Sequence, residues 1–285
     1  MQRLLIAFIQ HCYEGEADIH TARHAILVVQ FLGRHMKGKL RGAWDSIESW
    51  SAEIESFLRP PLPVGALRAL VGMARVMGFI YAKQGDTTPA LELFTLASLL
   101  EVGFFGLLRP GEMLSLCPRC VALPGSAAVA SRFAIISIQN TKNPRAMGRQ
   151  QFAVVRHPTA ALWLKWLFDD QPVDKPIWSW APSRLRGRFK WLSSLLGLEK
   201  CQFVLSSCRA GGATYFYQLG VEPTRLAFWG RWAAEKTVAH YVQEAMASLV
   251  LRQLSPQVSS RMVRLADITA YTMSPPSVSR KLLCR

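Results

Sequence analysis

The stretch FFGLLRPGEMLSL, residues 104–116, places an arginine at the end of an apolar segment. The apolar run reaches Arg109, and Pro110 and Gly111 follow at once. The ordinary role of an arginine in such a place is that of a solvated helix cap. The alternative is that Arg109 binds an anion. A guanidinium suits this role because the group is planar and stays charged. Other segments of the sequence indicate which of these two roles applies.

The residues that lead into this stretch predict a buried helix. Residues 90–108, ALELFTLASLLEVGFFGLL, are long and apolar enough to suggest a membrane span. Glu92 and Glu101 interrupt them, and charged side chains within a lipid bilayer are costly. A core helix is therefore the better interpretation, and we expect no membrane partner.

The composition favours a folded protein with a polyanionic partner. The chain has 285 residues, enough for one large domain or two modest ones, and half of them are hydrophobic, which argues against wholesale disorder. Lys and Arg number 34 against 19 Asp and Glu, so the net charge is +15. Such a surplus indicates nucleic acid first and an acidic membrane surface second.

The cysteines do not indicate a special site. Six are scattered along the chain without the spacing of a disulfide framework. Cys117 and Cys120 form a lone CxxC pair, whereas a structural zinc normally needs four ligands and no second pair lies nearby. We expect two ordinary cysteines at a helix–strand junction.

The order of expected elements predicts a mainly α fold with a small antiparallel β-sheet. Residues 1–58 read as helices, and the prolines of RPPLPVG, residues 59–65, predict a linker. The expected catalytic domain covers 66–249, and 250–285 is expected to be a tail that is mobile or docks on a partner protomer. The domain is predicted to hold helices at 66–84 and 89–108, strands at 132–140 and 150–157 around a basic turn, and helices at 158–170, 182–197, 206–219, 223–229 and 234–249.

A second arginine lies in LSSCRAGGATYFYQLGV, residues 205–221. Arg209 opens a predicted helix beside Gly211 and Gly212. Paired glycines let another backbone or a phosphate come close. Taken alone, the pair favours helix packing.

A tryptophan and a tyrosine follow in FWGRWAAEKTVAHYVQEA, residues 228–245. Trp232 precedes a predicted helix that carries Tyr241, whose usual role on an amphipathic helix would be half-buried packing. A phenol is a poor nucleophile unless cations stabilise the charge on a neighbouring phosphate. Lys142 lies in the basic turn between the two strands, where a solvated lysine is the common case.

In chain order, the five residues singled out so far are Arg109, Lys142, Arg209, Trp232 and Tyr241. This ordered series resembles that of the tyrosine recombinase family, the phage integrase-like enzymes. The resemblance covers most of residues 66–249, and 1–58 is similar to the family's N-terminal core-binding domain, though short for it. GLLRPGEMLSL looks like the first arginine motif, with an acidic residue at its usual position. The aromatic and basic makeup is similar to recombinases of eukaryotic mobile elements, including DIRS-type retroelements. The residues that carry the resemblance are Arg109, Glu112, Lys142, Arg209, Trp232 and Tyr241.

One position departs from the family pattern. The family usually has histidine three residues before the second arginine, and here that residue is Ser206. A serine donates a hydrogen bond, but it is no acid–base near neutral pH. His240 adjoins Tyr241 in sequence, yet neighbouring helical side chains point in different directions. The departure implies either a slowed enzyme or a derived copy that only binds DNA.

The resemblance implies a site-specific DNA recombinase. Arg109, oriented by Glu112, and Arg209 would bind the non-bridging oxygens of one phosphate, and Tyr241 would attack the phosphorus. Lys142 would protonate the leaving 5′-oxygen, and Trp232 would donate its indole N–H. No cofactor and no metal is implied. The expected partners are double-stranded DNA and three further protomers in a tetramer on DNA, in a nucleus or, in a bacterium, at the nucleoid.

Three other readings stay open. A non-catalytic DNA-binding protein derived from such an enzyme is favoured by Ser206. A type IB topoisomerase would use the same residues as a monomer without site preference. A helical protein-interaction module explains the packing, but not the ordered Arg, Lys, Arg, Trp, Tyr series.

Overall fold

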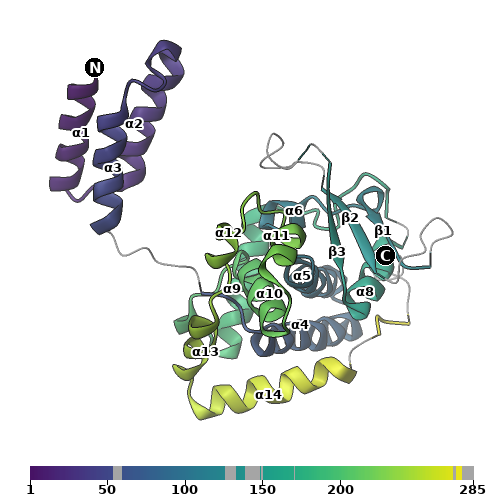
Figure 1. The fold of residues 1–285 in the computed structure, drawn as a ribbon. Coiled ribbons are helices and arrows are strands. Elements are labelled where there is room, and N and C mark those ends of the chain that lie inside the picture. The colour runs from purple at the N-terminus through teal and green to yellow at the C-terminus, as the bar shows by residue number, and fades with distance from the viewer. Residues whose placement is uncertain are drawn as a thin grey trace. The chain divides into compact units, whose positions relative to one another are not determined.

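The computed structural model shows two compact units, Met1–Leu58 and Arg59–Arg285 (Figure 1). The structure describes residues 1–53, 60–125, 133–138, 148, 150–169, 171–271 and 274–277. Helices predominate, and the described strands form one three-stranded antiparallel sheet. The predicted mainly α class with a small antiparallel sheet is thereby confirmed.

Three helices make up the N-terminal unit: α1 Gln2–Glu14, α2 Ile19–Leu32 and α3 Arg41–Glu53, with a 3₁₀ turn at Arg34–Met36. Asp18 caps α2 by accepting a hydrogen bond from the backbone N–H of His20 at 2.8 Å. The apolar positions recur at helical spacing and therefore face one another in a single small core. The core residues are Leu5, Ile9, Cys12, Ala22, Ile26, Leu40, Ala43, Ile47 and Trp50.

Helix α5 (Thr87–Phe105) is the central element of the second unit, and every residue from Ala90 to Phe105 is buried. It packs against α4 (Val64–Gln84), α8 (Pro158–Phe168), α9 (Pro182–Leu196) and α10 (Ser207–Gln218). By length and composition α4 and α5 could both cross a membrane, but 89% of the apolar window of α5 is buried inside the unit. This is the buried core helix that the sequence predicts.

The two acidic residues of α5 are neutralised inside the unit. Glu92 pairs with Arg184 and, at 2.7 Å, with Arg188 of α9. Glu101 pairs with Arg75 of α4 at 2.5 Å. A buried carboxylate needs such partners because its transfer from water is costly.

The sheet lies beside the end of α5. Its strands are β1 Val121–Ala122, β2 Ala134–Ile138 and β3 Gln151–Val155, in the order β1-β2-β3. Along β3 the residues alternate, with Gln151, Ala153 and Val155 buried and Phe152 exposed, as a sheet with one face on the core requires. Strand β3 is shorter than the predicted 150–157. Residues 132, 139 and 140 of the predicted strand over 132–140, and Lys142 in the turn between β2 and β3, lie outside the described residues.

The remaining elements of the second unit before α14 are short. They are α6 Pro110–Leu114, a 3₁₀ turn at Pro118–Cys120, a second 3₁₀ turn at Glu199–Cys201, α11 Pro223–Gly230, α12 Lys236–Ala239 and α13 Glu244–Arg252. Cys117 and Cys120 lie between α6 and β1 with their sulfur atoms 2.8 Å apart. The described residues contain no group of three His, Cys, Asp or Glu side chains that could hold a metal ion.

The glycine pair of α10 serves packing between backbones. A Cβ atom on Gly211 would lie 2.0 Å from the carbonyl oxygen of Leu62, and one on Gly212 would lie 2.1 Å from that of Phe104. The residue after Leu62, Pro63, caps α4, which begins at Val64, so the predicted linker ends before residue 65. Backbone, not a phosphate, occupies the space beside these glycines.

The prediction of a mobile tail from residue 250 is wrong for residues 256–271. They form α14 (Pro256–Tyr271), which lies along α4 (Figure 1). Gly72 of α4 allows the close approach, since a Cβ there would lie 2.4 Å from the carbonyl oxygen of Leu265. The partly apolar face of α14 is covered by α4 of the same chain. The composition of residues 250–285 alone did not indicate this packing.

Candidate active site

Arg109 and Glu112 form the first part of the site, at the start of α6. The backbone N–H of Arg109 donates to Glu112 Oε2 at 2.8 Å, and its guanidinium Nη1 donates to Oε1 at 2.7 Å. The side chain of Arg109 is 24% exposed, so part of its charge faces solvent. Glu112 therefore holds this arginine in the way expected of an orienting residue, and leaves it accessible.

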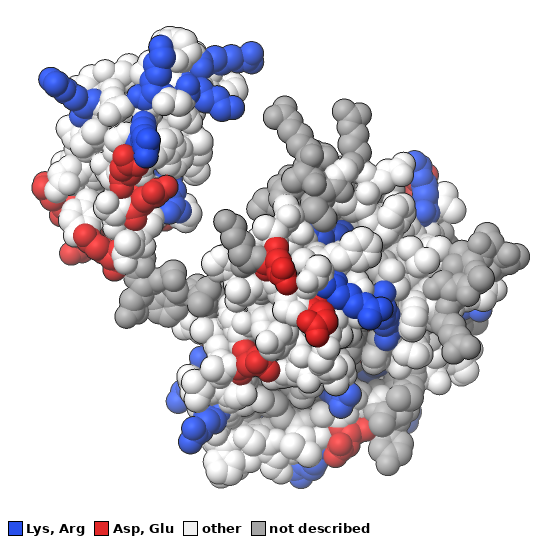
Figure 2. Space-filling view, viewed as in Figure 1, with Lys and Arg blue, Asp and Glu red and all other residues white. Residues whose placement is uncertain are grey.

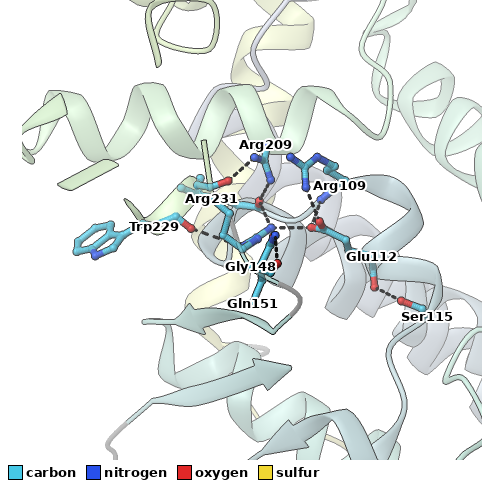
Figure 3. A network of polar contacts seen from close by, with 10 residues as sticks. Arg109, Glu112, Ser115, Gly148, Gln151, Arg209, Trp229 and Arg231 are labelled. Atoms are coloured by element: carbon cyan, nitrogen blue, oxygen red, sulfur yellow. Dashed lines mark hydrogen bonds and ion pairs between the residues drawn. The ribbon is translucent and has the colours of Figure 1, made fainter. Parts of the chain in front are cut away.

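Arg231 is a second arginine on the same carboxylate, and the sequence reasoning did not single it out. Its Nη2 atom lies 2.6 Å from Glu112 Oε2 and donates to the carbonyl oxygen of Leu107 at 3.1 Å (Figure 3). Arg231 has a φ of 57°, a left-handed conformation that is uncommon outside glycine and that ends α11. The unusual backbone turns its side chain into the unit.

Arg209 comes from the first turns of α10 and lies next to this pair. Its guanidinium donates to the carbonyl oxygens of Leu107 and Gly230, and only 2% of the residue is exposed. Arg209 and Arg231 thus share one acceptor, the Leu107 carbonyl, which follows α5 (Figure 3). Three segments that are far apart in the sequence supply three guanidinium groups to one place.

Trp232 and Tyr241 stack beside Arg209. Their ring centroids are 4.7 Å apart, and Arg209 Cζ lies 4.7 Å from the Trp232 ring and 5.4 Å from the Tyr241 ring. Trp232 also packs on Gly230, where a Cβ would lie 2.0 Å from the indole ring. Trp232 is buried and Tyr241 is half-buried, so the phenol lies at the edge of the cationic cluster and not in the core.

The segment that carries Tyr241 is not the continuous helix predicted over 234–249. Helix α12 ends at Ala239, α13 begins at Glu244, and Tyr241 lies in the turn between them. Thr214 of α10 holds this turn, because its hydroxyl donates to the Tyr241 carbonyl and accepts from the Gln243 N–H, each at 3.1 Å. Tertiary hydrogen bonds replace helical ones at this point.

Electrostatics keep the cluster charged. Burial opposes ionisation of Glu112, but the charge of Arg231 and the hydrogen bonds from Arg109 outweigh it, so the pKa of Glu112 lies below its ordinary value. Burial, followed by the charges of Arg231 and Arg109, lowers the pKa of Arg209 to about 9. Three cations against one carboxylate leave a positive excess at neutral pH.

Unused donors point to an anion as the ligand of this cluster. A guanidinium carries five N–H donors, and Arg209 Nε is buried without a hydrogen-bond partner among the described residues. The same holds for Trp232 Nε1. Buried donors normally have partners, so these two are available to an acceptor that enters the site.

The two other predicted site residues are Ser206 and Lys142. Ser206 lies at the start of α10, its carbonyl oxygen accepts a hydrogen bond from the Arg209 N–H at 3.2 Å, and it lines a cavity together with Pro110. Lys142 lies outside the described residues. His240 is exposed. The predicted residues that do come together are Arg109, Glu112, Arg209, Trp232 and Tyr241.

The charged surface around the site is not uniform. On the face shown in Figure 2, the Lys and Arg side chains of the second unit are interspersed with acidic and uncharged ones. In the N-terminal unit, basic side chains gather toward one end and acidic ones toward the other (Figure 2).

Comparisons with known proteins give a limited result. No protein-family model and no curated protein sequence matches the chain. A solved structure described as the crystal structure of XerA recombinase is similar with a TM-score of 0.47 and 13% identity, over 90% of this chain and 99% of that one. A similarity of this size does not identify the chemistry, which has to follow from the site residues.

Proposed function

We propose that this chain is a DNA strand-breaking and rejoining enzyme of the tyrosine recombinase type, with Tyr241 as the nucleophile. One observation carries the proposal. Arg109, Arg209, Trp232 and Tyr241, which lie in three separate segments, gather around a positive cluster with unused donors. A tyrosine beside cations that could hold a phosphate is what nucleophilic phosphoryl transfer needs.

In the proposed step, the oxygen of the Tyr241 phenol forms a bond to phosphorus as the bond to the 5′-oxygen breaks. The phenol loses its proton to water, and the leaving 5′-oxygen takes one from Lys142. The products are a 3′-phosphotyrosine and a free 5′-hydroxyl. Because the covalent link keeps the energy of the phosphodiester, the reverse attack by a 5′-hydroxyl rejoins DNA without an external energy source.

The arginines would stabilise the charge that develops on the phosphate. Arg109 is partly exposed and Arg209 retains unused donors, so both could donate to non-bridging oxygens in the planar, charge-assisted manner of guanidinium. Removing one such contact typically costs about 3 kcal/mol of transition-state stabilisation. Glu112 would not contact the phosphate; it positions Arg109 by accepting its hydrogen bonds. Arg231 in turn positions Glu112 and donates to the Leu107 carbonyl, the same acceptor that Arg209 uses.

A second candidate is a DNA-binding protein that has lost catalysis. It is favoured by Ser206, which replaces the acid–base residue of the resembled family. It is favoured also by Arg209, a residue that is 2% exposed and whose guanidinium donates to two backbone carbonyls. A cluster held together in this way could bind DNA through Arg109 alone.

A nicked duplex that releases a short strand after cleavage separates the two candidates. The full chain should accumulate a covalent protein–DNA adduct that migrates more slowly on a denaturing gel. Tyr241→Phe, which keeps the ring on Trp232, should bind the same DNA and give no adduct. Tyr217→Phe is the matched control, because Tyr217 is exposed on α10 and should leave the adduct unchanged.

The outcomes decide between the candidates. Binding without any adduct favours the non-catalytic protein. An adduct that survives Tyr241→Phe would show that another residue is the nucleophile. Relaxation of supercoiled plasmid without site preference, abolished by the same variant, would assign the chain to type IB topoisomerase chemistry instead.

A further inference from the structure

A cavity of about 250 Å³ lies directly beside the cationic cluster, between β3 and α11. Leu107 and Arg231, which belong to the cluster, form one wall. The remaining wall is largely aromatic and includes Phe152, Trp229 and Phe228. The cavity therefore adjoins the place where the proposed function puts a DNA phosphate.

The mouth of this cavity presents aromatic rings to solvent. Phe228 is 78% exposed and Phe152 is 54% exposed, from α11 and from the outward face of β3. Trp229 is fixed between them in part by an edge-to-face contact with Phe216, at a centroid distance of 5.4 Å. An exposed apolar patch of this kind, beside charged groups, is typical of an interaction or ligand-binding site.

Two further arginines lie over the same tryptophan. Arg156 Cζ is 4.0 Å and Arg225 Cζ is 5.4 Å from the Trp229 ring. Neither makes an ion pair with a carboxylate within the part of the chain that the structure describes. Burial, followed by the charge of Arg225, lowers the pKa of Arg156, which is the mark of cations crowded without an anion.

A ligand that fits has both a flat ring and a negative charge. Nucleotides have both, and proteins that bind unpaired bases stack them on aromatic rings and on guanidinium planes. Gln150 and Gln151 add amide groups at the edge of the cavity, which could meet the polar edge of a base. A perfectly paired base cannot enter, because both its faces are stacked in the duplex.

We infer that this cavity is a subsite for one unstacked nucleotide of DNA, next to the phosphate that Tyr241 would attack. The base stacks on the exposed ring of Phe228, beside Trp229, whose own ring is covered by Arg156, and its phosphate lies near Arg156 and Arg225. The inference rests on the proposed function, because it takes DNA as the ligand of the neighbouring cluster. It adds a preference for distorted or unpaired DNA at the cleavage position.

The test compares three forms of one short duplex: fully paired, with one extra unpaired adenosine, and with an abasic residue in place of that adenosine. The two bulged forms have the same number of backbone phosphates and differ only in the base. The full chain should bind the adenosine bulge more tightly than the abasic bulge by about 5- to 150-fold, the range that stacking of one base provides. Phe228→Ala should abolish this difference and leave affinity for paired DNA unchanged.

A matched control is Leu219→Ala, which removes a 62% exposed apolar side chain away from the cavity and should keep the difference. Equal affinity of the full chain for the two bulges overturns the inference, as does an equal loss for all three duplexes in Phe228→Ala. The readout needs no cleavage and can be repeated in Tyr241→Phe. A base preference without a covalent adduct would overturn only the catalytic proposal, and an adduct without a base preference would overturn only the subsite.

Discussion

Arg231 lies 4% exposed between a glycine and a tryptophan, and its role is set by the carboxylate that it meets. Its Nη2 atom is 2.6 Å from Glu112 Oε2, while Arg109 holds the other oxygen at 2.7 Å. Removing one partner of a buried pair leaves the other without compensation, which costs more than the pair contributes when whole. Arg231 is thus a positioning residue, because it fixes the group that orients Arg109.

Arg231→Ala should lower the free energy of unfolding by about 3 kcal/mol. Denaturant unfolding followed by circular dichroism measures this change. Arg119→Ala is the matched control, since Arg119 pairs with Asp174 at 2.6 Å with both side chains 66% exposed. It should cost less than about 1 kcal/mol. Equal effects of the two variants would contradict the buried role of Arg231.

Single residues of the site could be predicted from the sequence only where a pattern marked them. Arg109 and Arg209 stand out because each interrupts an apolar or small-residue segment. Arg231 has no such mark, since a charged residue after a short helix usually faces solvent. Its burial depends on a left-handed backbone and on a carboxylate more than a hundred residues away, neither of which is visible in its neighbourhood.

Among the elements, α10 shows how closely the second unit is packed. Its two glycines bring the backbone of α10 against Leu62 and Phe104, so that Arg209 on the same helix reaches the Leu107 carbonyl. A side chain at Gly212 would meet the Phe104 carbonyl oxygen at 2.1 Å and would push α10 away from α5. The separation that follows would also move Arg209.

Gly212→Ala should therefore destabilise the chain, by an amount that overcomes the helix-propensity gain of roughly 0.5–1 kcal/mol that alanine brings. Gly187→Ala in α9 is the control, because a Cβ added there would meet no atom within 4 Å and its backbone is helical. We expect a lower melting temperature for the first variant and an equal or higher one for the second. A higher melting temperature for Gly212→Ala would show that α10 and α5 can move apart without loss of stability.

At the scale of elements, periodicity predicted most of what the structure shows. Ala43, Ile47 and Trp50 recur at helical spacing and do form one buried face of α3. The prediction of one helix over 234–249 was wrong because its interruption has a tertiary cause: the Thr214 hydroxyl donates to the Tyr241 carbonyl and accepts from the Gln243 N–H. Helix α14 was missed because its partner, α4, lies almost two hundred residues earlier in the chain.

For the whole molecule, the charge is divided unequally between the two units. Residues 1–58 contain six Lys and Arg against seven Asp and Glu, a net charge of −1, so residues 59–285 carry +16 and the whole chain +15. The basic residues of the N-terminal unit are nevertheless concentrated, with Arg34, Lys37 and Lys39 in the connection between α2 and α3 and Arg41 at the start of α3. At the other end of α2, Glu14 ends α1, and Glu16 and Asp18 lie in the connection between α1 and α2.

Under the proposed function, this separation predicts which end of the N-terminal unit contacts DNA. Each phosphate neutralised by a cation contributes a slope of about −0.9 to the fall of log affinity with log salt. Replacing Lys37 and Lys39 by alanine should weaken binding at low salt and make the slope shallower by up to about two. Fluorescence anisotropy of a labelled duplex in increasing salt measures both quantities.

The control changes the net charge by the same amount at the opposite end. Glu14→Gln with Glu16→Gln raises the charge by two, but α2 has 14 residues and so keeps these positions roughly 20 Å from the basic connection. That distance is about twice the Debye length at 0.1 M salt, so the slope should stay as in the parent chain. If the lysine variant kept the parent's slope, the basic connection would not contact phosphate. If both pairs shifted affinity equally in opposite directions, net charge and not local contact would govern binding.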